Sequence, residues 1–182
     1  NLPVLPIYRS ESSNESIHII PSRPPSIMGG ASHEFFVDCP QDSLLFQLAR
    51  CLTYSRPEFA LVGMHGASAF RNIMLGMCLV YNRALPHSAE RSQVLHWTQI
   101  FEALPAAALR QLQPIFKDAY TDLSNDNALD SYFRAVDHTA HRAGLLLAGD
   151  LQASIYSIHR EHEGIAKMKP RDIIKDLILF WC

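Results

Sequence analysis

The residues best suited to chemistry in this sequence recur at helical spacing within residues 129–150. Four polar side chains follow one another at steps of three or four, which places them on one stripe of an α-helix: Asp130, Arg134, Asp137 and His141. A carboxylate one turn before an imidazole can orient that ring in a catalytic or metal-binding arrangement. The same pattern suits a hydrogen-bonded polar seam that fixes how the helix packs on a neighbour. We favour the structural interpretation, because no nucleophile stands at a compelling place in the sequence.

A second candidate cluster lies in the segment IHREHEG, which gathers two histidines and two glutamates just before Gly164. His159 and Glu163 are four residues apart, so a helix would point both side chains the same way. The segment is not H-E-x-x-H, and it falls one residue short of the inverted H-x-x-E-H form. We therefore interpret it as a solvated helix end, keep His159, His162 and Glu163 only as weak metal candidates, and predict no cofactor.

Composition excludes several classes of function. The 182 residues are 48% hydrophobic and 19% charged, as in a packed globular protein, and the formal charge of -2 offers no field to attract nucleic acid or an anionic membrane. No apolar run approaches the roughly 18 residues of a spanning helix. The four cysteines are scattered without a C-x-x-C pair, and no phosphate-binding G-x-x-x-x-G-K-[ST] motif occurs. We expect a cytoplasmic protein with reduced thiols.

The sequence pattern divides the chain into an N-terminal polar segment, a segment of short predicted strands and a long helical part. Residues 1–16, with two prolines and the polar run SESSNES, predict an extended arm or linker. From residue 17 the segments IHII, SIMGG and EFFVDC predict short strands in a small hairpin or meander, and the strand after Pro24 and Pro25 is expected at an edge. Everything beyond Pro40 has helical periodicity. The expected fold class is mainly α (α+β), with one compact multi-helix domain over residues 17–182.

Proline and glycine divide the helical part of the chain. The segment QDSLLFQLARCLTY predicts a helix that stops before Pro57, followed by a short non-helical stretch, RPEFALVG. The polar LSNDNA segment supplies a loop and N-cap for the helix of residues 129–150, Gly149 breaks that helix, and Pro170 begins the last one. Gly144 would cost about 1 kcal/mol relative to alanine in a helix interior, so it indicates a close helix crossing.

Two stretches taken together resemble the C-terminal region of large bacterial tetratricopeptide-type proteins, which is similar to a degenerate gluzincin metallopeptidase domain: LLFQLARCLTYSRPEF and FRAVDHTAHRAGLLLAGDLQASI. In active gluzincins of this kind one helix carries H-E-x-x-H, with two zinc-ligand histidines and a general-base glutamate, and a later helix supplies a carboxylate as third ligand. In this sequence Arg50, Cys51 and Tyr54 stand at the His, Glu and His positions, and Asp137 stands near that of the third ligand.

The resemblance implies a zincin-like fold over most of residues 26–182 and a lost peptidase activity, because the ligands for zinc and the base for its water are missing. It also implies that an ion pair between Arg50 and Asp137 takes the place of the metal as a link between two helices. The residues of the expected structural seam are Arg50, Tyr54, Asp130, Arg134, Asp137 and His141.

We therefore expect a catalytically inactive, zincin-like helical domain, a pseudopeptidase, that acts as a protein-interaction or scaffold module. Its partner would be another protein or other domains of a longer parent chain. Two alternatives stay open. One is a metal-dependent hydrolase that uses an unrecognised set of His, Asp and Glu residues, and the other is a helical regulatory domain that holds a small apolar ligand between its helices.

Overall fold

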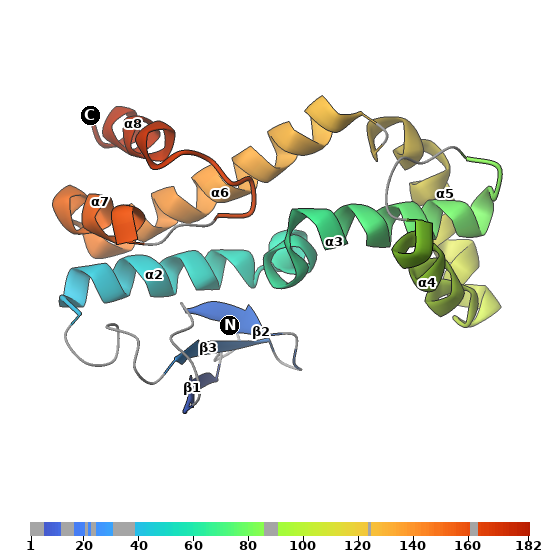
Figure 1. The fold of residues 1–182 in the computed structure, drawn as a ribbon, viewed down its shortest axis with the longest axis horizontal. Helices are drawn as coiled ribbons and strands as arrows, with labels where there is room; N and C mark the ends of the chain where they lie inside the picture. The colour runs from blue at the N-terminus through green and yellow to red at the C-terminus, as the bar shows by residue number, and fades with distance from the viewer. Residues whose placement is uncertain are drawn as a thin grey trace. The chain divides into compact units, whose positions relative to one another are not determined.

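The computed structural model describes residues 6–11, 17–20, 22, 25–30, 39–85, 91–123, 125–160 and 164–182 (Figure 1). Most of these residues are helical, and a small mixed sheet lies near the N-terminus. The chain forms two compact units, unit 1 with residues 1–64 and 134–182, and unit 2 with residues 65–133. Each unit is described by itself below. None of the helices in the described ranges is both long enough and apolar enough to cross a membrane.

The elements follow one another in chain order as β1 (Ile7–Ser10), β2 (His18–Ile20), β3 (Ser26–Gly30), α2 (Gln41–Tyr54), α3 (Pro57–Tyr81), α4 (Arg91–Glu102), α5 (Ala106–Leu123), α6 (Asp126–Ala148), α7 (Leu151–Arg160) and α8 (Pro170–Trp181). A mainly helical chain with a small β element was predicted, and the structure confirms it.

The sheet has the strand order β1-β3-β2, with β1 parallel and β2 antiparallel to β3. β1 lies inside the segment predicted to be an extended arm. The prediction that β3 is an edge strand is wrong, since β3 pairs on both sides. Pro25 directly precedes its first residue, so the missing N–H removes no bond from the ladder. The predicted EFFVDC strand falls almost wholly on residues 31–38, outside the described ranges.

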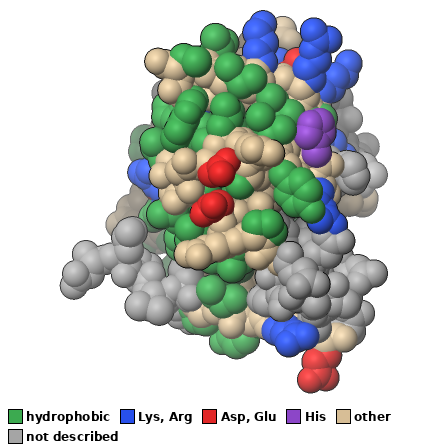
Figure 2. Space-filling view, turned by 90° about the vertical axis from the view of Figure 1, so that its left-hand side faces the viewer, with side chains coloured by type: hydrophobic (Ala, Val, Ile, Leu, Met, Phe, Trp, Pro, Cys, Tyr) green, Lys and Arg blue, Asp and Glu red, His purple; other side chains and the backbone are tan. Residues whose placement is uncertain are grey.

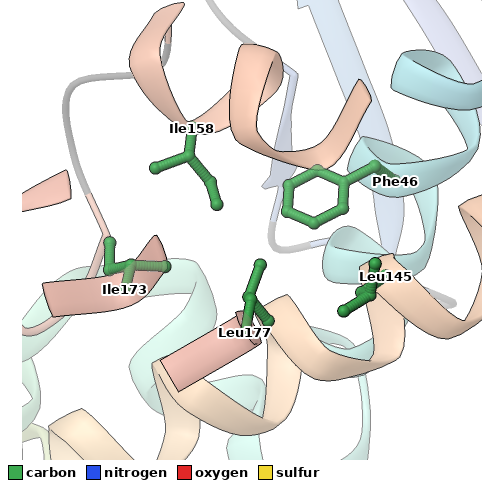
Figure 3. Packing of buried hydrophobic residues seen from close by; sticks show 5 residues of the cluster. All are labelled: Phe46, Leu145, Ile158, Ile173 and Leu177. Atoms are coloured by element: carbon green, nitrogen blue, oxygen red, sulfur yellow. The ribbon is translucent and has the colours of Figure 1, made fainter. Parts of the chain in front are cut away.

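Helix α2 is buried on two faces. Its Phe46 packs with Leu145 of α6, Ile158 of α7, and Ile173 and Leu177 of α8, and all five side chains are buried (Figure 3). The opposite face carries Cys51 with Leu44 and Leu48 and packs on apolar side chains of the sheet region, Ile17, Ile19 and Ile27. α2 therefore joins the sheet to the three helices of unit 1 that come later in the chain (Figure 1).

The range of α3 covers two helical segments that meet at Gly66, and the first of them was not predicted. The RPEFALVG stretch, expected to be non-helical, is helical from Pro57 onward, and the N–H groups of Phe59 and Ala60 both donate to the carbonyl of Arg56. Pro57 ends α2 but also suits the first turn of the next helix, where its missing N–H costs nothing. Gly66, with φ of 76°, interrupts the helical geometry of α3.

The structure confirms the predicted cap of α6, the break after α6 and the start of α8. The side chain of Asn125 accepts a hydrogen bond from the N–H of Asn127 at 3.1 Å and caps α6. Gly149 follows the last residue of α6 with φ of 67°, in the left-handed region that terminates helices. Pro170 is the first residue of α8, as expected.

Unit 2 is held by close helix crossings of its own. A Cβ on Gly76 of α3 would lie 2.7 Å from Trp97 Cβ of α4, so only glycine permits this approach. The hydroxyl of Thr98 then donates to the carbonyl of Gly76 at 3.2 Å. From the far end of α3, the hydroxyl of Tyr81 donates to the carbonyl of Leu109 on α5 at 2.5 Å.

Gly144 lies at the close crossing that its position in a helix interior indicated. A Cβ at this residue would stand 2.7 Å from Phe46 Cδ2 and 2.9 Å from the Phe46 carbonyl oxygen. One of these neighbours is backbone, so α6 cannot accept a methyl group here without moving away from α2.

We predict that Gly144→Ala destabilises the protein by about 1–3 kcal/mol, the usual cost of overpacking, although alanine has the higher helix propensity. The measurement is the free energy of unfolding in urea. Thr139→Ala, at an exposed position of the same helix, serves as the control and should change stability by less than about 0.7 kcal/mol. A Gly144→Ala variant as stable as wild type would contradict the tight crossing.

Candidate functional site

The carboxylate of Asp137 is the centre of the polar seam of unit 1. It is fully buried, and three donors surround it. Its Oδ1 accepts hydrogen bonds from the Tyr54 hydroxyl at 2.9 Å and from the Ile165 N–H at 3.1 Å, and its Oδ2 accepts one from the Ala166 N–H at 2.8 Å. All three partners donate, which is what an ionised, acceptor-only carboxylate requires. This one side chain thus connects α6 to α2 and to the segment before α8.

The turn at residues 164–166 closes tightly over this carboxylate. A Cβ on Gly164 would lie 2.6 Å from Asp137 Oδ2, so with any other residue type either the turn or the carboxylate would have to shift. The turn is completed by the N–H of Lys167, which donates to the Gly164 carbonyl at 3.3 Å, and Lys167 itself has a left-handed φ of 50°. The segment is therefore shaped to present two backbone N–H groups to a buried anion.

His141 lies one helical turn after Asp137 and is almost fully buried. Its Nδ1 stands 2.6 Å from the Asp137 carbonyl oxygen, and since a carbonyl only accepts, Nδ1 carries the proton. Burial, and to a smaller extent the nearby Arg50 cation, lowers the pKa of His141 well below its usual value. The imidazole is thus neutral at physiological pH and is bonded to its own helix.

Arg50 lies on α2, one helical turn before Tyr54. Its Nη1 donates to Gln47 Oε1 at 2.8 Å, and its Cζ lies 5.7 Å from the centre of the Phe46 ring. An ion pair between Arg50 and Asp137 was expected, and the hydrogen bonds that the structure shows on Asp137 come from Tyr54 and from two backbone N–H groups. The amide nitrogen of Gln47 is buried without a hydrogen-bond partner in the described structure.

Tyr54 is the residue that links the two helices. Burial raises the pKa of its hydroxyl, and the Arg50 cation opposes this shift without cancelling it. The hydroxyl therefore stays protonated and donates a hydrogen bond to Asp137 Oδ1. Cys51, on the same helix, points to the other side: it is buried with the sheet residues, and its Sγ lies 3.9 Å from the Ile17 carbonyl oxygen.

The remaining predicted residues lie apart from this centre. Asp130 and Arg134 are on α6 as expected, but both are exposed. Of the weak metal candidates, His159 is exposed on the last turn of α7, whereas His162 and Glu163 fall outside the described residues. Across the described part of the chain, no three His, Cys, Asp or Glu side chains come together as metal ligands.

A second polar link, which sequence reasoning missed, fastens α8 to α6. Arg142 donates to both carboxylate oxygens of Asp176, from Nε at 3.0 Å and from Nη2 at 2.6 Å. His138 Nδ1 lies 3.0 Å from Asp176 Oδ2 at ion-pair distance, although the angle falls short of a hydrogen bond. Burial raises the pKa of Asp176. The hydrogen bond from Arg142 and the interactions with the His138 and Arg142 side chains oppose this shift, and the net effect is a pKa below the ordinary value.

We predict that Asp137→Asn destabilises unit 1 by about 1–3 kcal/mol, because its amide NH₂ would face either the N–H of Ala166 or the donors on Oδ1. Tyr54→Phe should cost less, about 0.5–1.5 kcal/mol, since it removes one hydrogen bond and leaves Asp137 with its two backbone donors. Urea unfolding measures both. Asp130→Asn, an exposed change on the same helix, is the matched control, and equal stability of the two Asn variants would contradict a structural role for Asp137.

We also predict a pH-dependent contribution from Asp176. Because its pKa is lowered in the folded state, the stabilisation is complete above the unfolded value of about 3.9 and is lost as the pH falls through the folded pKa. The difference in unfolding free energy between wild type and Asp176→Asn should therefore be largest near neutral pH and shrink below about pH 4. A difference that persists unchanged at pH 3 would refute the link.

In a comparison of the chain with known proteins, no protein-family model, no curated protein and no solved structure matched it. The site is therefore interpreted from its own contacts, which describe a buried carboxylate, a neutral imidazole and a tyrosine whose hydrogen bonds are made within the protein.

Proposed function

We propose that this chain is a zincin-like helical module without catalytic activity, which binds another protein or another domain of a longer parent chain as an interaction or scaffold unit. The zincin-like character rests on the sequence resemblance described above. The observation that carries the interaction is a set of large apolar side chains that are exposed on α6 and α8 of unit 1.

This set of side chains, called here the α8 face, lies mostly at the end of α8. Ile173 and Leu177 of α8 are buried in the core, yet the four residues that follow Leu177 are also large and apolar and are 40–71% exposed, as are Leu146 and Leu147 of α6 at 66% and 51%. The α8 face consists of Leu146, Leu147, Ile178, Leu179, Phe180 and Trp181. Figure 2, which views the end of the molecule where α7 and α8 lie, shows hydrophobic side chains gathered over much of it. Exposed apolar groups that gather in this way mark interaction surfaces.

The state of the polar seam supports the absence of catalysis. A reactive carboxylate needs a free lone pair and space for a substrate or water. Asp137 has donors on both oxygens, and Gly164 lies so close that there is no room for an added methyl group beside Oδ2. His141 uses Nδ1 for a bond to its own helix. Asp137 thus acts as a structural connection between parts of the chain, and His141 is bonded within α6.

The α8 face gives a direct test. Leu179→Glu combined with Trp181→Glu should leave the thermal midpoint within about 2 °C of wild type, because both side chains are exposed, but should abolish partner binding. Ile115→Glu, at a position of α5 that is 61% exposed, is the matched control. Affinity capture from an extract of the source cells, followed by mass spectrometry, should find a protein retained by wild type and by the control but lost with the double variant. If the wild type, the control and the double variant captured identical sets of proteins, the α8 face would not be the binding surface.

The competing metal-hydrolase function has its own test. Elemental analysis of the purified full chain should find less than stoichiometric zinc, with no change for Asp137→Asn or His159→Ala. One equivalent of zinc that either substitution removes would overturn the proposal, since a bound zinc ion would supply the Lewis acid and activated water that the described residues do not provide.

A further inference from the structure

The exposed side of α8 carries two kinds of side chain, one after the other. Arg171 and Lys175 are exposed and stand one helical turn apart, and the exposed Ile178 and Leu179 follow three and four residues after Lys175. Steps of three and four residues place these four side chains on one stripe of a helix. This stripe, called here the outer stripe, therefore begins basic and ends apolar.

The opposite side of α8 is already occupied by contacts within unit 1. Ile173 and Leu177 are buried in the core, and Phe180 lies under the guanidinium of Arg142, with 5.2 Å from Cζ to the ring centre. Asp176 is also bound to Arg142. A helix that lies on a lipid surface buries its apolar side in the bilayer, and that side of α8 is not available. The outer stripe is thus better suited to a protein partner than to a membrane.

Positive charge is concentrated around the beginning of α8. Lys167 and Lys169 are exposed just before the helix, as Arg171 and Lys175 are within it. None of these four side chains forms an ion pair with a residue that the structure describes. Asp172 is exposed among them and offsets only one of the four charges. In Figure 2, Lys and Arg side chains border hydrophobic ones at the top of the view. A complementary partner therefore carries negative charge beside its apolar groups.

We propose that the partner of the α8 face is an acidic amphipathic segment of a protein, whose apolar side chains pack on Ile178 and Leu179 and whose carboxylates pair with Arg171 and Lys175. This inference rests on the proposed function, because it names the partner of the same surface. The stripe from Arg171 to Leu179 extends over about 12 Å at the helical rise of about 1.5 Å per residue, so about two turns of a partner helix cover it.

The experiment uses a phage-displayed library of random peptides of about 16 residues, selected on the full chain. Wild type should enrich peptides that combine Asp or Glu with large apolar residues. The charge-reversal variant Arg171→Glu with Lys175→Glu should instead enrich Lys and Arg beside the same apolar residues, because like charges repel. Arg110→Glu, at an exposed position of α5, is the matched control and should select acidic peptides as the wild type does.

Isothermal titration then measures the affinity of one selected acidic peptide. Charge reversal at Arg171 and Lys175 should weaken its binding about tenfold or more, and added salt should weaken its binding to the wild type. Leu179→Ser with Trp181→Ser, which changes no charge, should abolish binding by removing the apolar contacts. This last variant tests the proposed function, whereas charge reversal and salt test the acidic nature of the partner.

The possible failures differ in what they overturn. Selected peptides without an excess of acidic residues, or an affinity that neither charge reversal nor salt changes, would refute the acidic partner and leave the α8 face as a binding surface. Unchanged binding to the Leu179→Ser, Trp181→Ser variant would contradict the proposed function itself. If no peptide is enriched, the proposal is refuted. Binding to phosphatidylcholine vesicles that contain phosphatidylserine would then assign the outer stripe to a lipid surface, and salt-sensitive dimerisation would assign it to a second copy of the chain.

Discussion

The arrangement of the described residues of unit 1 depends on the buried carboxylate of Asp137. A carboxylate removed from water is tolerated only when hydrogen-bond donors replace the lost solvent, and for Asp137 these donors come from two other parts of the chain. Tyr54 brings α2 to α6, and the N–H groups of Ile165 and Ala166 bring in the segment that leads to α8. The requirement to satisfy this charge explains why a glycine stands at position 164 and why the chain turns there before α8 begins.

Hydrophobic burial and polar contacts have different roles around α2. Phe46 and its neighbours on α6, α7 and α8 remove a large apolar area from water, which favours any compact packing of these helices. The bonds of Asp137, and those of Arg142 with Asp176, are directional and fit only one arrangement. The apolar core therefore supplies most of the stabilisation, while the polar links select which packing is adopted.

Local signals in the sequence predicted the elements well. The period of α6, the cap at Asn125, the break at Gly149 and the start at Pro170 each depend on a few adjacent residues, and the structure confirms them. Gly144 could even be assigned to a close crossing, because a helical glycine is costly without one. The errors arose where one residue type fits two situations. Proline ends a helix and also begins one, as at Pro57, and a proline before a strand does not make that strand an edge, as at Pro25.

The sequence predicted which two helices carry the site, but it did not predict which hydrogen bonds join them. Tyr54 and Asp137 were both singled out, yet 83 residues separate them, and no local pattern shows that the Tyr54 hydroxyl reaches the carboxylate. The position of Asp130 and Arg134 on the same stripe did not reveal that both are exposed. The N–H groups of residues 165 and 166 donate from the backbone, so no side-chain type in the sequence reveals them. The contacts of Asp176 with His138 and Arg142 depend on how α8 packs on α6, which the sequence does not show.

Gly164 also limits how this scaffold could be redesigned. Placing histidines at positions 50 and 54 would put two nitrogen ligands on α2, but the carboxylate opposite them would still be held by the backbone of residues 165 and 166. A metal ion would have to compete with two amide protons already in place, in a space too small for a methyl group. A working metal centre would therefore require a longer or differently shaped connection between α7 and α8, so the loop rather than the helices sets the limit on new chemistry.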